Sequence, residues 1–156
     1  MIQITPVLTV EDLINDESFD SSAYEGYIYM TTNLETGRSY IGKKSFFHKL
    51  NKKLGKKELA EQPVTRGRAK TTKLVIKSSD WKSYYGSAQE IKEDLKKYPK
   101  DKFTRAVLKL CKTKKELTYF ECKYLFQYGV LEDRTTWIND NILGKFYTSD
   151  FKQLAG

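Results

Sequence analysis

Residues 26–42 have the sequence GYIYMTTNLETGRSYIG, and this stretch decides the fold. Residues 26–32 alternate in character and are rich in aromatic and β-branched side chains, which predicts a β-strand. Residues 33–37 (Asn-Leu-Glu-Thr-Gly) have the composition of a turn, and a second strand is predicted to begin at residue 38. The stretch therefore predicts a β-hairpin.

Two tyrosines and a glycine in this hairpin are candidates for a functional site. Antiparallel pairing can place the phenols of Tyr29 and Tyr40 close together across the two strands. Gly42 has no side chain, so a backbone or a ligand can come close to the second strand there. Lys43 and Lys44 follow directly and bring positive charge to the same end of the hairpin.

The composition is that of a single globular domain with a modest core. The chain has 156 residues, of which 39% are hydrophobic and 31% are charged. No run of about 18 apolar residues is present, and the first residues lack the features of a secretory signal. Two cysteines are too few for a zinc site or a disulfide framework. We therefore expect a cytoplasmic protein with no membrane segment.

The positive charge is concentrated in one segment. Residues 1–24 contain five acidic residues and no Lys or Arg, whereas residues 42–77 contain twelve Lys or Arg against Glu58 and Glu61. A local excess of this size next to a candidate site is typical of proteins that bind a polyanion. The alternative is a solvated basic loop with no partner.

The remaining elements are predicted from helix caps and periodicity. An acidic N-terminal segment, residues 1–23, contains a capping box at 9–12 and either packs on the domain or forms a small lid. Residues 24–156 form the main domain, with a mobile basic insertion at about 45–78 that can order on a nucleic acid. Further predictions are a strand at 71–76 that returns to the sheet, a capped helix from 87 to Pro99, a strand at 103–111 and a capped helix at 113–128.

This order of elements predicts an α+β fold with a small mixed or antiparallel three-stranded sheet flanked by helices. The blocks Tyr-Ile-Tyr at 27–29 and Tyr-Ile-Gly at 40–42 resemble the motifs of the GIY-YIG nuclease superfamily. In the first block Tyr27 stands where the family has glycine, and Gly26 is displaced by one position. The second block is intact.

The resemblance extends over roughly residues 24–146. Residues 40–46 and 80–87 are similar to segments of small, stand-alone GIY-YIG proteins of bacteriophages. The resemblance implies a metal-dependent endonuclease that hydrolyses phosphodiester bonds in double-stranded DNA, in the cytoplasm of a bacterium or a phage-infected host cell. A non-catalytic nucleic-acid-binding module on the same fold is the main alternative, and a basic interaction protein is the third.

Glu121 is singled out by its spacing in the last long helix. Leu117, Glu121, Tyr124 and Tyr128 recur at offsets of four, three and four, so they share one stripe of the helix. A carboxylate on a buried stripe is costly unless a cation or a hydrogen bond satisfies it. One interpretation is a buried glutamate satisfied by Lys or Tyr. The resemblance implies instead that Glu121 is the ligand of a single divalent metal, Mg²⁺ or Mn²⁺.

The resemblance also assigns roles to the phenols. It implies that Tyr29 helps to activate water, with Tyr40 close by. A phenol is a poor base at its usual pKa of about 10, and we expect Lys43 and Lys44 to favour the phenolate. The alternative is an aromatic pair that only packs the hairpin.

The family arginine that follows the second motif has no clear counterpart. Lys82 together with Tyr85 is the best substitute, and Arg66 and Arg68 are weaker candidates. Asn139 or Asn141 stands near a late family asparagine that supports the site, although both are also typical turn residues. Trp81, Tyr84 and Tyr85 either stack on bases or fill the core.

The predicted site falls into three groups. The catalytic candidates are Tyr29, Tyr40, Lys44, Lys82, Tyr85 and Glu121, with Glu121 also the metal ligand. The supporting candidates are Asn139 and Asn141. The nucleic-acid-binding candidates are Lys43, Lys52, Lys53, Arg66, Arg68, Lys70 and Trp81.

Overall fold

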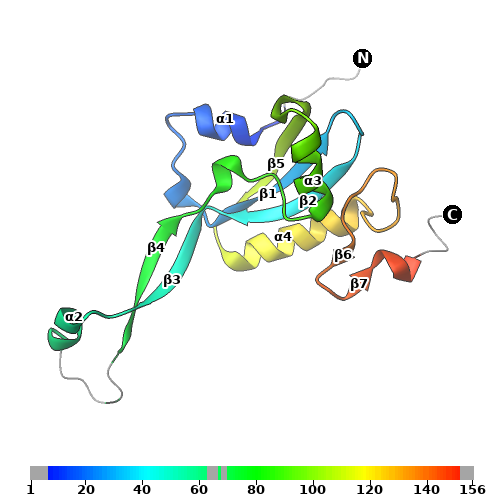
Figure 1. Cartoon of the computed structure of the whole chain (residues 1–156). Helices are drawn as coiled ribbons and strands as arrows, with labels where there is room; N and C mark the ends of the chain where they lie inside the picture. Colours follow the sequence, from blue (N-terminus) through cyan, green and yellow to red (C-terminus); the bar gives the residue numbers. More distant parts are fainter. Residues whose placement is uncertain (1–6, 63–66, 68–69, 152–156) are drawn as a thin grey trace. The chain divides into compact units, whose positions relative to one another are not determined.

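A computed structural model describes residues 7–62, 67 and 70–151 (Figure 1). The chain divides into two compact units. The first, here called the main unit, contains the chain up to Phe46 and from Asp80 onward. The second, here called the arm, is Phe47–Ser79.

The main unit is built on an antiparallel three-stranded sheet, as predicted. Its strands are β1 (Gly26–Asn33), β2 (Ser39–Ser45) and β5 (Phe103–Cys111), in the order β2-β1-β5. The hairpin turn between β1 and β2 is closed by Gly37, whose φ is 73° and whose N–H donates to the Asn33 carbonyl at 2.8 Å. The predicted α+β fold is confirmed.

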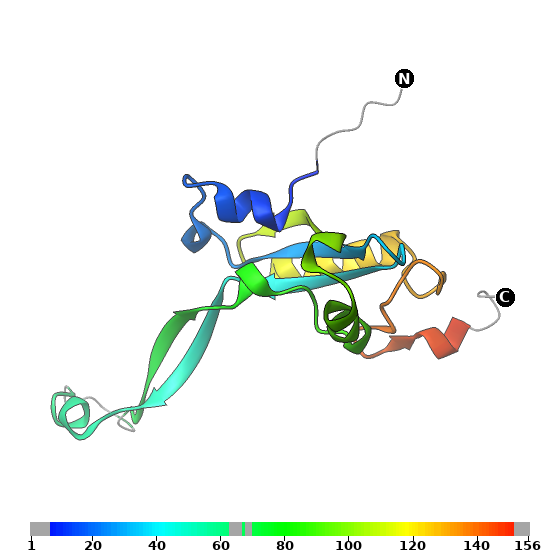
Figure 2. The ribbon, with the colours of Figure 1, turned by 45° about the horizontal axis from the view of Figure 1, so that its top comes forward.

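Helices cover both faces of this sheet. The long helix α4 (Lys114–Gln127) packs along one face, where Leu117 and Leu125 meet Ile28 and Ile41 in the hydrophobic core (Figure 2). The opposite face carries the aromatic side chains of β1. It is covered by α1 (Val10–Asn15), the short 3₁₀ turn η2 (Trp81–Ser83) and α3 (Gln89–Lys97). The tyrosines of the hairpin and helix α4 therefore start from opposite faces of the sheet.

The acidic N-terminal helix packs on the sheet. Thr9 and Asp12 form the predicted capping box, and Val10 and Leu13 are buried. Glu11 accepts hydrogen bonds from the guanidinium of Arg105 at 2.9 and 2.6 Å. Arg105 lies on β5 and is only 3% exposed, so the ion pair ties α1 to the sheet. Of the two possibilities left by the sequence, packing on the domain is the one observed.

The helix caps differ from the prediction in two places. Helix α3 begins after Ala88, which makes no side-chain cap, so the capping box predicted at 87–90 is wrong. The hydroxyl of Ser87 lies 3.0 Å from that of Tyr40 and is engaged there. At α4, Thr113 caps the N–H of Glu116 as predicted. The Glu116 carboxylate accepts from the N–H of Lys112, one residue before the position expected for a box.

The arm is more regular than the sequence indicates. Strands β3 (Phe47–Lys53) and β4 (Thr72–Ser78) form a separate antiparallel ribbon, and the chain between them contains α2 (Lys56–Ala60) (Figure 1). The expectation of an irregular insertion is wrong, and β4 pairs with β3 instead of joining the main sheet. The strand predicted at 71–76 is present as β4, but β3 was not predicted, because it buries no face and its sequence lacks the alternation of apolar and polar residues.

The other short elements lie in the main unit. They are η1 (Ser21–Ala23), η3 (Lys100–Lys102), β6 (Asn141–Ile142), β7 (Phe146–Tyr147) and η4 (Thr148–Phe151). Among the described residues, no helix has both the length and the apolar character needed to cross a lipid bilayer.

Candidate active site

Tyr29 lies against Gly42, its partner across the two strands. A Cβ atom at Gly42 would stand 2.4 Å from the Tyr29 hydroxyl and 3.0 Å from the Tyr40 ring. The glycine therefore makes room for the Tyr29 ring to lie across β2. The ring is 2% exposed and its centroid is 6.3 Å from that of Tyr40. The structure thus brings the two predicted phenols together, with Tyr29 as the buried member.

Tyr40 is the half-buried member of the pair and lies at the edge of the sheet. Its hydroxyl is 3.0 Å from the Ser87 hydroxyl, and its ring lies beside Gly86. Gly86 has a φ of 148°, which side chains rarely adopt, so the chain can pass close to the tyrosine there. Tyr40 is held from two sides while its outer edge remains open.

Glu121 and Tyr40 line one cleft of about 270 Å³. Strand β2 is the edge of the sheet, and the cleft lies where the tyrosine and the carboxylate from α4 meet at this edge. Asp140 and Asn141 also line it. The predicted convergence of Glu121 with a hairpin phenol is therefore seen for Tyr40. Tyr29 is not among the residues that line this cleft.

The outward N–H groups of β2 explain how Glu121 is held. The N–H of Ser39 donates to the Thr136 carbonyl at 2.8 Å, and the N–H of Ile41 donates to Oδ1 of Asn139 at 3.0 Å. Two residues further on, the N–H of Lys43 donates to the Glu121 carboxylate. The carboxylate is thus the third acceptor in a row along the open edge of the strand.

Of the two candidate asparagines, Asn139 bonds the backbone beside Tyr40, whereas Asn141 is a turn residue. Asn139 is 5% exposed, and its Nδ2 donates to the Ile41 carbonyl at 2.8 Å while its Oδ1 accepts from the Ile41 N–H. This pair of bonds fixes the backbone next to Tyr40. Asn141 accepts from the Gly144 N–H and donates to Asp140, both within its own turn.

The electrostatics of the phenols differ from the prediction. Burial raises the pKa of Tyr40, and the nearby phenol of Tyr84 and the carboxylates of Glu121 and Asp140 raise it further, while the Ser87 hydrogen bond opposes them. Burial also holds the pKa of Tyr29 well above its usual value. The expectation that lysines favour the phenolate is therefore wrong, because desolvation dominates. Both hydroxyls are protonated at neutral pH.

The two lysines are engaged elsewhere. Lys44 lies 2.6 Å from Asp80 and 4.0 Å from the centre of the Tyr84 ring. Lys43 donates to Thr118 at 3.2 Å, and its charge acts on Glu121. Burial raises the pKa of Glu121, and Lys43 partly opposes that effect. Lys43 thus favours the ionised form of the carboxylate.

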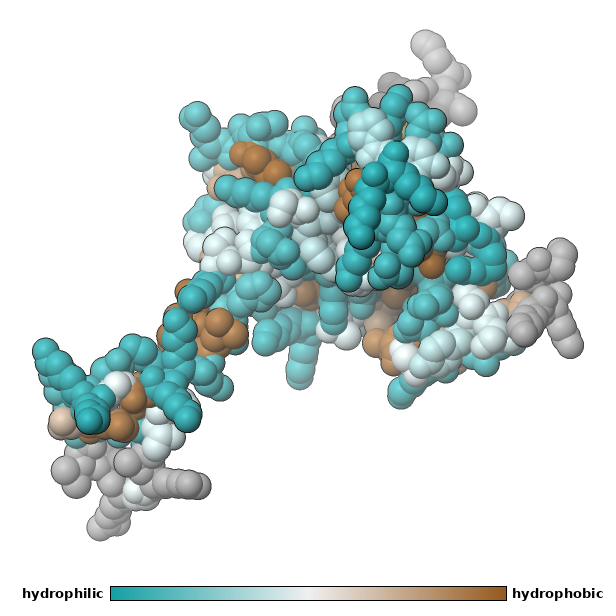
Figure 3. Space-filling model, viewed as in Figure 1, coloured by the Kyte–Doolittle hydropathy of each residue, from teal (hydrophilic) through white to brown (hydrophobic). Residues whose placement is uncertain are grey.

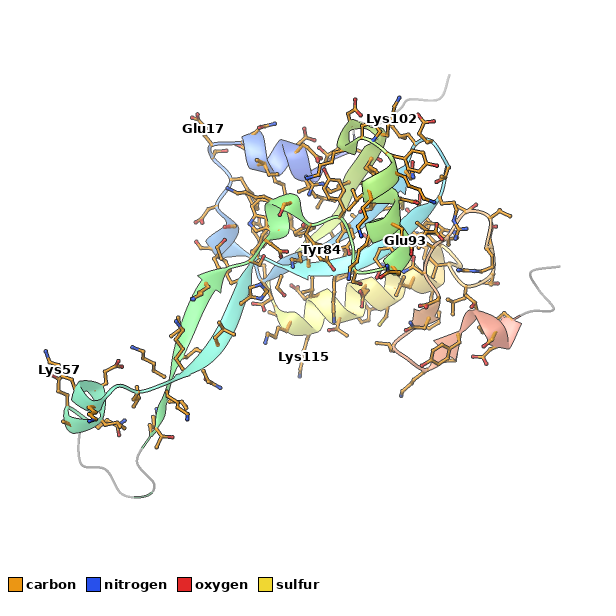
Figure 4. All side chains as sticks on the ribbon, viewed as in Figure 1. Glu17, Lys57, Tyr84, Glu93, Lys102 and Lys115 are labelled. Atoms are coloured by element: carbon orange, nitrogen blue, oxygen red, sulfur yellow. The ribbon has the colours of Figure 1, made fainter. Side chains whose placement is uncertain are left out.

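Tyr84, and not the predicted Tyr85, completes the aromatic group around Tyr29. Tyr84 lies in the segment that leads from η2 to α3 (Figure 4). Its ring meets that of Tyr29 edge-on, with centroids 5.8 Å apart, and the two phenols share a hydrogen bond. Tyr85 instead packs on Phe103 and lies under the Arg105 guanidinium. Tyr85 therefore belongs to the core of the opposite part of the sheet.

Two further predicted residues do not reach the cleft. Lys82 is exposed on η2, and its carbonyl accepts from Arg105. Trp81 is 4% exposed and packs against Phe46 and Tyr27, so its ring cannot stack on a base. The prediction that Trp81 binds nucleic acid is wrong because the ring fills the core.

Arg134 is a residue that the sequence reasoning missed. A second cavity, of about 510 Å³, is lined by Tyr40, Ser87, Glu90 and Arg134 and shares Tyr40 with the first. Arg134 donates to the carbonyls of Ile138 and Asn139, which uses two of its five N–H groups. No local motif marks this arginine, since it reaches the cavity from a loop after α4.

The predicted nucleic-acid-binding lysines Lys52, Lys53 and Lys70 are all exposed residues of the arm. Lys43 is exposed on β2. Arg66 and Arg68 lie outside the described residues.

The donor set in the first cleft fits a hard divalent cation. Carboxylate oxygens are available from Glu121 and Asp140, and Mg²⁺ is commonly held by one or two carboxylates together with substrate phosphates. Within the part of the chain that the structure describes, no group of three or more His, Cys, Asp or Glu side chains could hold a metal. A divalent ion in this cleft would therefore need further ligands, such as phosphate oxygens of a substrate.

A comparison with protein families matches residues 11–142, most of the chain, to a family model described as "Putative endonuclease segE, GIY-YIG domain". No curated protein and no solved structure matched the chain.

Proposed function

The chain belongs to the GIY-YIG family of endonuclease domains, and from this premise we propose that it is a metal-dependent endonuclease that hydrolyses phosphodiester bonds in DNA. Family membership supports a nuclease that acts on nucleic acid. The observation that carries the finer proposal is the cleft at the edge of β2, where Glu121 and Tyr40 meet.

Glu121 is proposed as the main ligand of one Mg²⁺ or Mn²⁺ ion, with Asp140 beside it in the same cleft. The ion would neutralise charge on the scissile phosphate and lower the pKa of water. Among the described residues, Glu121 and Asp140 are the carboxylates that line the cleft, so phosphate oxygens would fill part of the coordination shell of the ion. This arrangement would link metal binding to substrate binding.

Tyr40 is proposed as a hydrogen-bond donor to the phosphate. Its raised pKa keeps the hydroxyl protonated at neutral pH, so it can donate a proton or a hydrogen bond but is poorly suited to act as a base. Ser87 and Gly86 hold the ring in place. Tyr29 and Tyr84 form the buried support behind it.

Arg134 is proposed to take the part of the missing family arginine. Three of its N–H groups remain after the two carbonyl contacts, and a planar guanidinium can bind two phosphate oxygens at once. Its cavity adjoins the cleft through Tyr40, Asp140 and Asn141. A backbone that crosses Tyr40 would therefore meet Glu121 on one side and Arg134 on the other.

A non-catalytic nucleic-acid-binding module remains the second candidate. The observation that favours it is the hydrogen bond from the Lys43 N–H to Glu121. This bond gives the carboxylate a structural role that needs no metal. The two candidates predict different effects on DNA cleavage when the charge of Glu121 is removed but its hydrogen-bond acceptor is kept.

Replacement of Glu121 by Gln makes that distinction. The amide oxygen of Glu121→Gln still accepts the Lys43 N–H, but the charge that holds a metal is lost. Metal stabilisation is worth several kcal/mol, so supercoiled-plasmid cleavage in Mg²⁺ or Mn²⁺ should fall by at least about 100-fold. Glu93→Gln, an exposed glutamate on α3, is the charge-matched control and should cleave like the wild type.

Tyr40→Phe should reduce cleavage by about 10- to 100-fold through loss of one hydrogen bond to a charged phosphate. Tyr147→Phe, which removes an exposed hydroxyl, is its control. Full cleavage by Glu121→Gln would contradict the metal-ligand proposal. DNA binding without cleavage in either metal by the wild type would establish the second candidate.

A further inference from the structure

The entire net charge of the chain lies in the arm. Residues 47–79 contain eight lysines and two arginines against two glutamates, and the rest of the chain contains equal numbers of basic and acidic residues. The formal net charge of +8 is therefore the charge of the arm alone. An unbalanced charge of this density indicates a polyanionic partner.

The two faces of the β3–β4 ribbon differ in chemistry. The register pairs His48 with Lys77, Leu50 with Val75 and Lys52 with Lys73, so these six side chains share one face. Like charges directly opposite each other destabilise a strand pair. Crowding by Lys77 lowers the pKa of Lys52, and the Lys77 hydrogen bond is the largest cause. This face, here called the lysine face, carries positive charge on both strands.

The other face combines a polar row with an apolar row. On β3 it presents Lys49, Asn51 and Lys53, and on β4 it presents Leu74 and Ile76. Leu74 and Ile76 are 60% and 58% exposed, although such side chains are usually buried. Figure 3 shows apolar patches on the ribbon between hydrophilic side chains. This face is here called the mixed face.

We propose that the arm binds duplex DNA by laying the β3–β4 ribbon in the major groove, with the mixed face against the base edges and the lysines on the bordering phosphates. The proposal rests on the proposed function and adds to it the duplex form of the substrate and the element that recognises it. It uses only contacts made by the arm.

The dimensions and chemistry of the groove fit the ribbon. The major groove of B-form DNA is about 12 Å wide and admits a two-stranded β-ribbon. Asn is a suitable partner for adenine, and apolar side chains contact the methyl group of thymine. Long lysine side chains on either face can extend to phosphates on both sides. Each strand of seven residues, at about 3.3 Å per residue, would follow roughly seven base pairs.

Other polyanions and a second copy fit less well. The major groove of an RNA duplex is deep and narrow, so the side chains of the mixed face could not reach its bases. A second copy of the arm would have to approach against the same charge of +8, which like-charge repulsion opposes. Single strands offer no groove for the ribbon.

Equilibrium binding in EDTA tests the proposal without any cleavage. The full chain is titrated into labelled duplex DNA, single-stranded DNA and an RNA duplex of the same sequence, and into phosphatidylserine vesicles. We expect duplex DNA to bind at least about 10-fold more tightly than the other three probes. Equal binding of single strands, RNA or vesicles would overturn the proposal.

Charge-matched triple variants locate the contact. Lys49→Ala, Lys52→Ala and Lys53→Ala are combined in one variant. Lys112→Ala, Lys114→Ala and Lys115→Ala, three exposed lysines of the main unit, form the control. The arm variant should lower the slope of log Kobs against log salt by about 2 to 3, since each phosphate contact contributes about 0.9. An equal effect of both triples would overturn the proposal.

A last pair of variants tests the mixed face. Asn51→Ala and Leu74→Ala should keep the salt slope but reduce the spread of affinities over a pool of duplexes of different sequence. An unchanged spread would exclude base contacts by this face. Duplex binding in EDTA is measured without the metal site, whereas the nuclease proposal is tested by plasmid cleavage in Mg²⁺ or Mn²⁺, so failure of the arm proposal and failure of the nuclease proposal give different results.

Discussion

The main unit and the arm handle charge in opposite ways. In the main unit Arg105 is buried and its guanidinium binds Glu11 and the carbonyls of Lys82 and Tyr84. In the arm the lysines are exposed, and their pairing strands bury no face. The first arrangement fixes the shape of a site. The second keeps the charge at the surface of the molecule.

This difference also concerns stability. A two-stranded hairpin without a buried face is marginal by itself, whereas a sheet covered by helices on both sides has a core. Substitutions of the same type should therefore be costly in the main unit and nearly silent in the arm.

The largest difference is expected between Arg105→Ala and Lys73→Ala. Loss of Arg105 leaves buried acceptors without a donor, and breaking such a pair costs about 3 kcal/mol even though Glu11 is half exposed. Lys73 pairs with Glu58 on the arm surface at 2.9 Å, and exposed pairs contribute little. Urea unfolding should show a clear shift for the first variant only. Equal midpoints would show that the contrast between the units is wrong.

The two asparagines near the cleft should behave differently. Asn139→Ala removes both partners of the Ile41 backbone in a buried position, and we expect a loss of about 2–3 kcal/mol and weaker cleavage. Asn141→Ala affects a turn and should change stability and cleavage much less than Asn139→Ala. Thermal unfolding and plasmid cleavage on the two variants make the comparison. A larger effect at Asn141 would reverse the assignment of the supporting residue.

Substitution of Gly42 in the main unit and of Gly55 in the arm by alanine compares the effect of an added methyl group in the two units. An Ala side chain at Gly42 would collide with Tyr29, and overpacking of this kind costs about 1–3 kcal/mol and should displace both phenols. At Gly55 in the arm the nearest atom would be 3.8 Å away, which is an ordinary contact. Cleavage and unfolding midpoints should fall for Gly42→Ala and change little for Gly55→Ala.

The smallest expected effect is on the pH dependence of the free energy of unfolding. Burial raises the pKa of Glu121, so its contribution to stability is present below the unfolded value and is lost as pH rises through the folded value. Its Gln variant should therefore gain stability relative to the wild type as the pH rises above the unfolded pKa of about 4.3 and toward the raised folded value.

Glu58 in the arm should show the opposite sign. The hydrogen bond from Lys73 lowers its pKa, so its contribution is lost as pH falls. Denaturant unfolding of Glu121→Gln and Glu58→Gln over the same pH range measures both slopes. Parallel slopes would contradict the assigned environments.

The hairpin, the three strands of the sheet and the stripe that carries Glu121 could be predicted because their signals are local. Periodicity and turn residues mark them over a few neighbouring positions. The Asn139 contact with Ile41 and the Glu11 contact with Arg105 join residues 98 and 94 positions apart in the sequence. No local sequence pattern predicts either contact.

The remaining errors have definite physical causes. The prediction of Tyr85 rests on its spacing after Lys82, whereas in the folded chain Tyr84 contacts Tyr29 and Tyr85 packs against Phe103. The lysines were expected to lower the pKa of the phenols, but burial outweighs their charge. The strand at 71–76 could be predicted, but β3 and its pairing with that strand could not, because neither strand buries a face.

The hydrogen-bonded backbone N–H groups along the open edge of β2 also bear on aggregation at high protein concentration. An open strand edge is a template on which another chain can add a strand, and this is a common route to aggregation. Thr136, Asn139 and Glu121 accept from three of the N–H groups along this edge, those of Ser39, Ile41 and Lys43. Truncation of Glu121 to alanine would remove the acceptor of the Lys43 N–H, so we expect this variant to aggregate more readily than the wild type at high concentration.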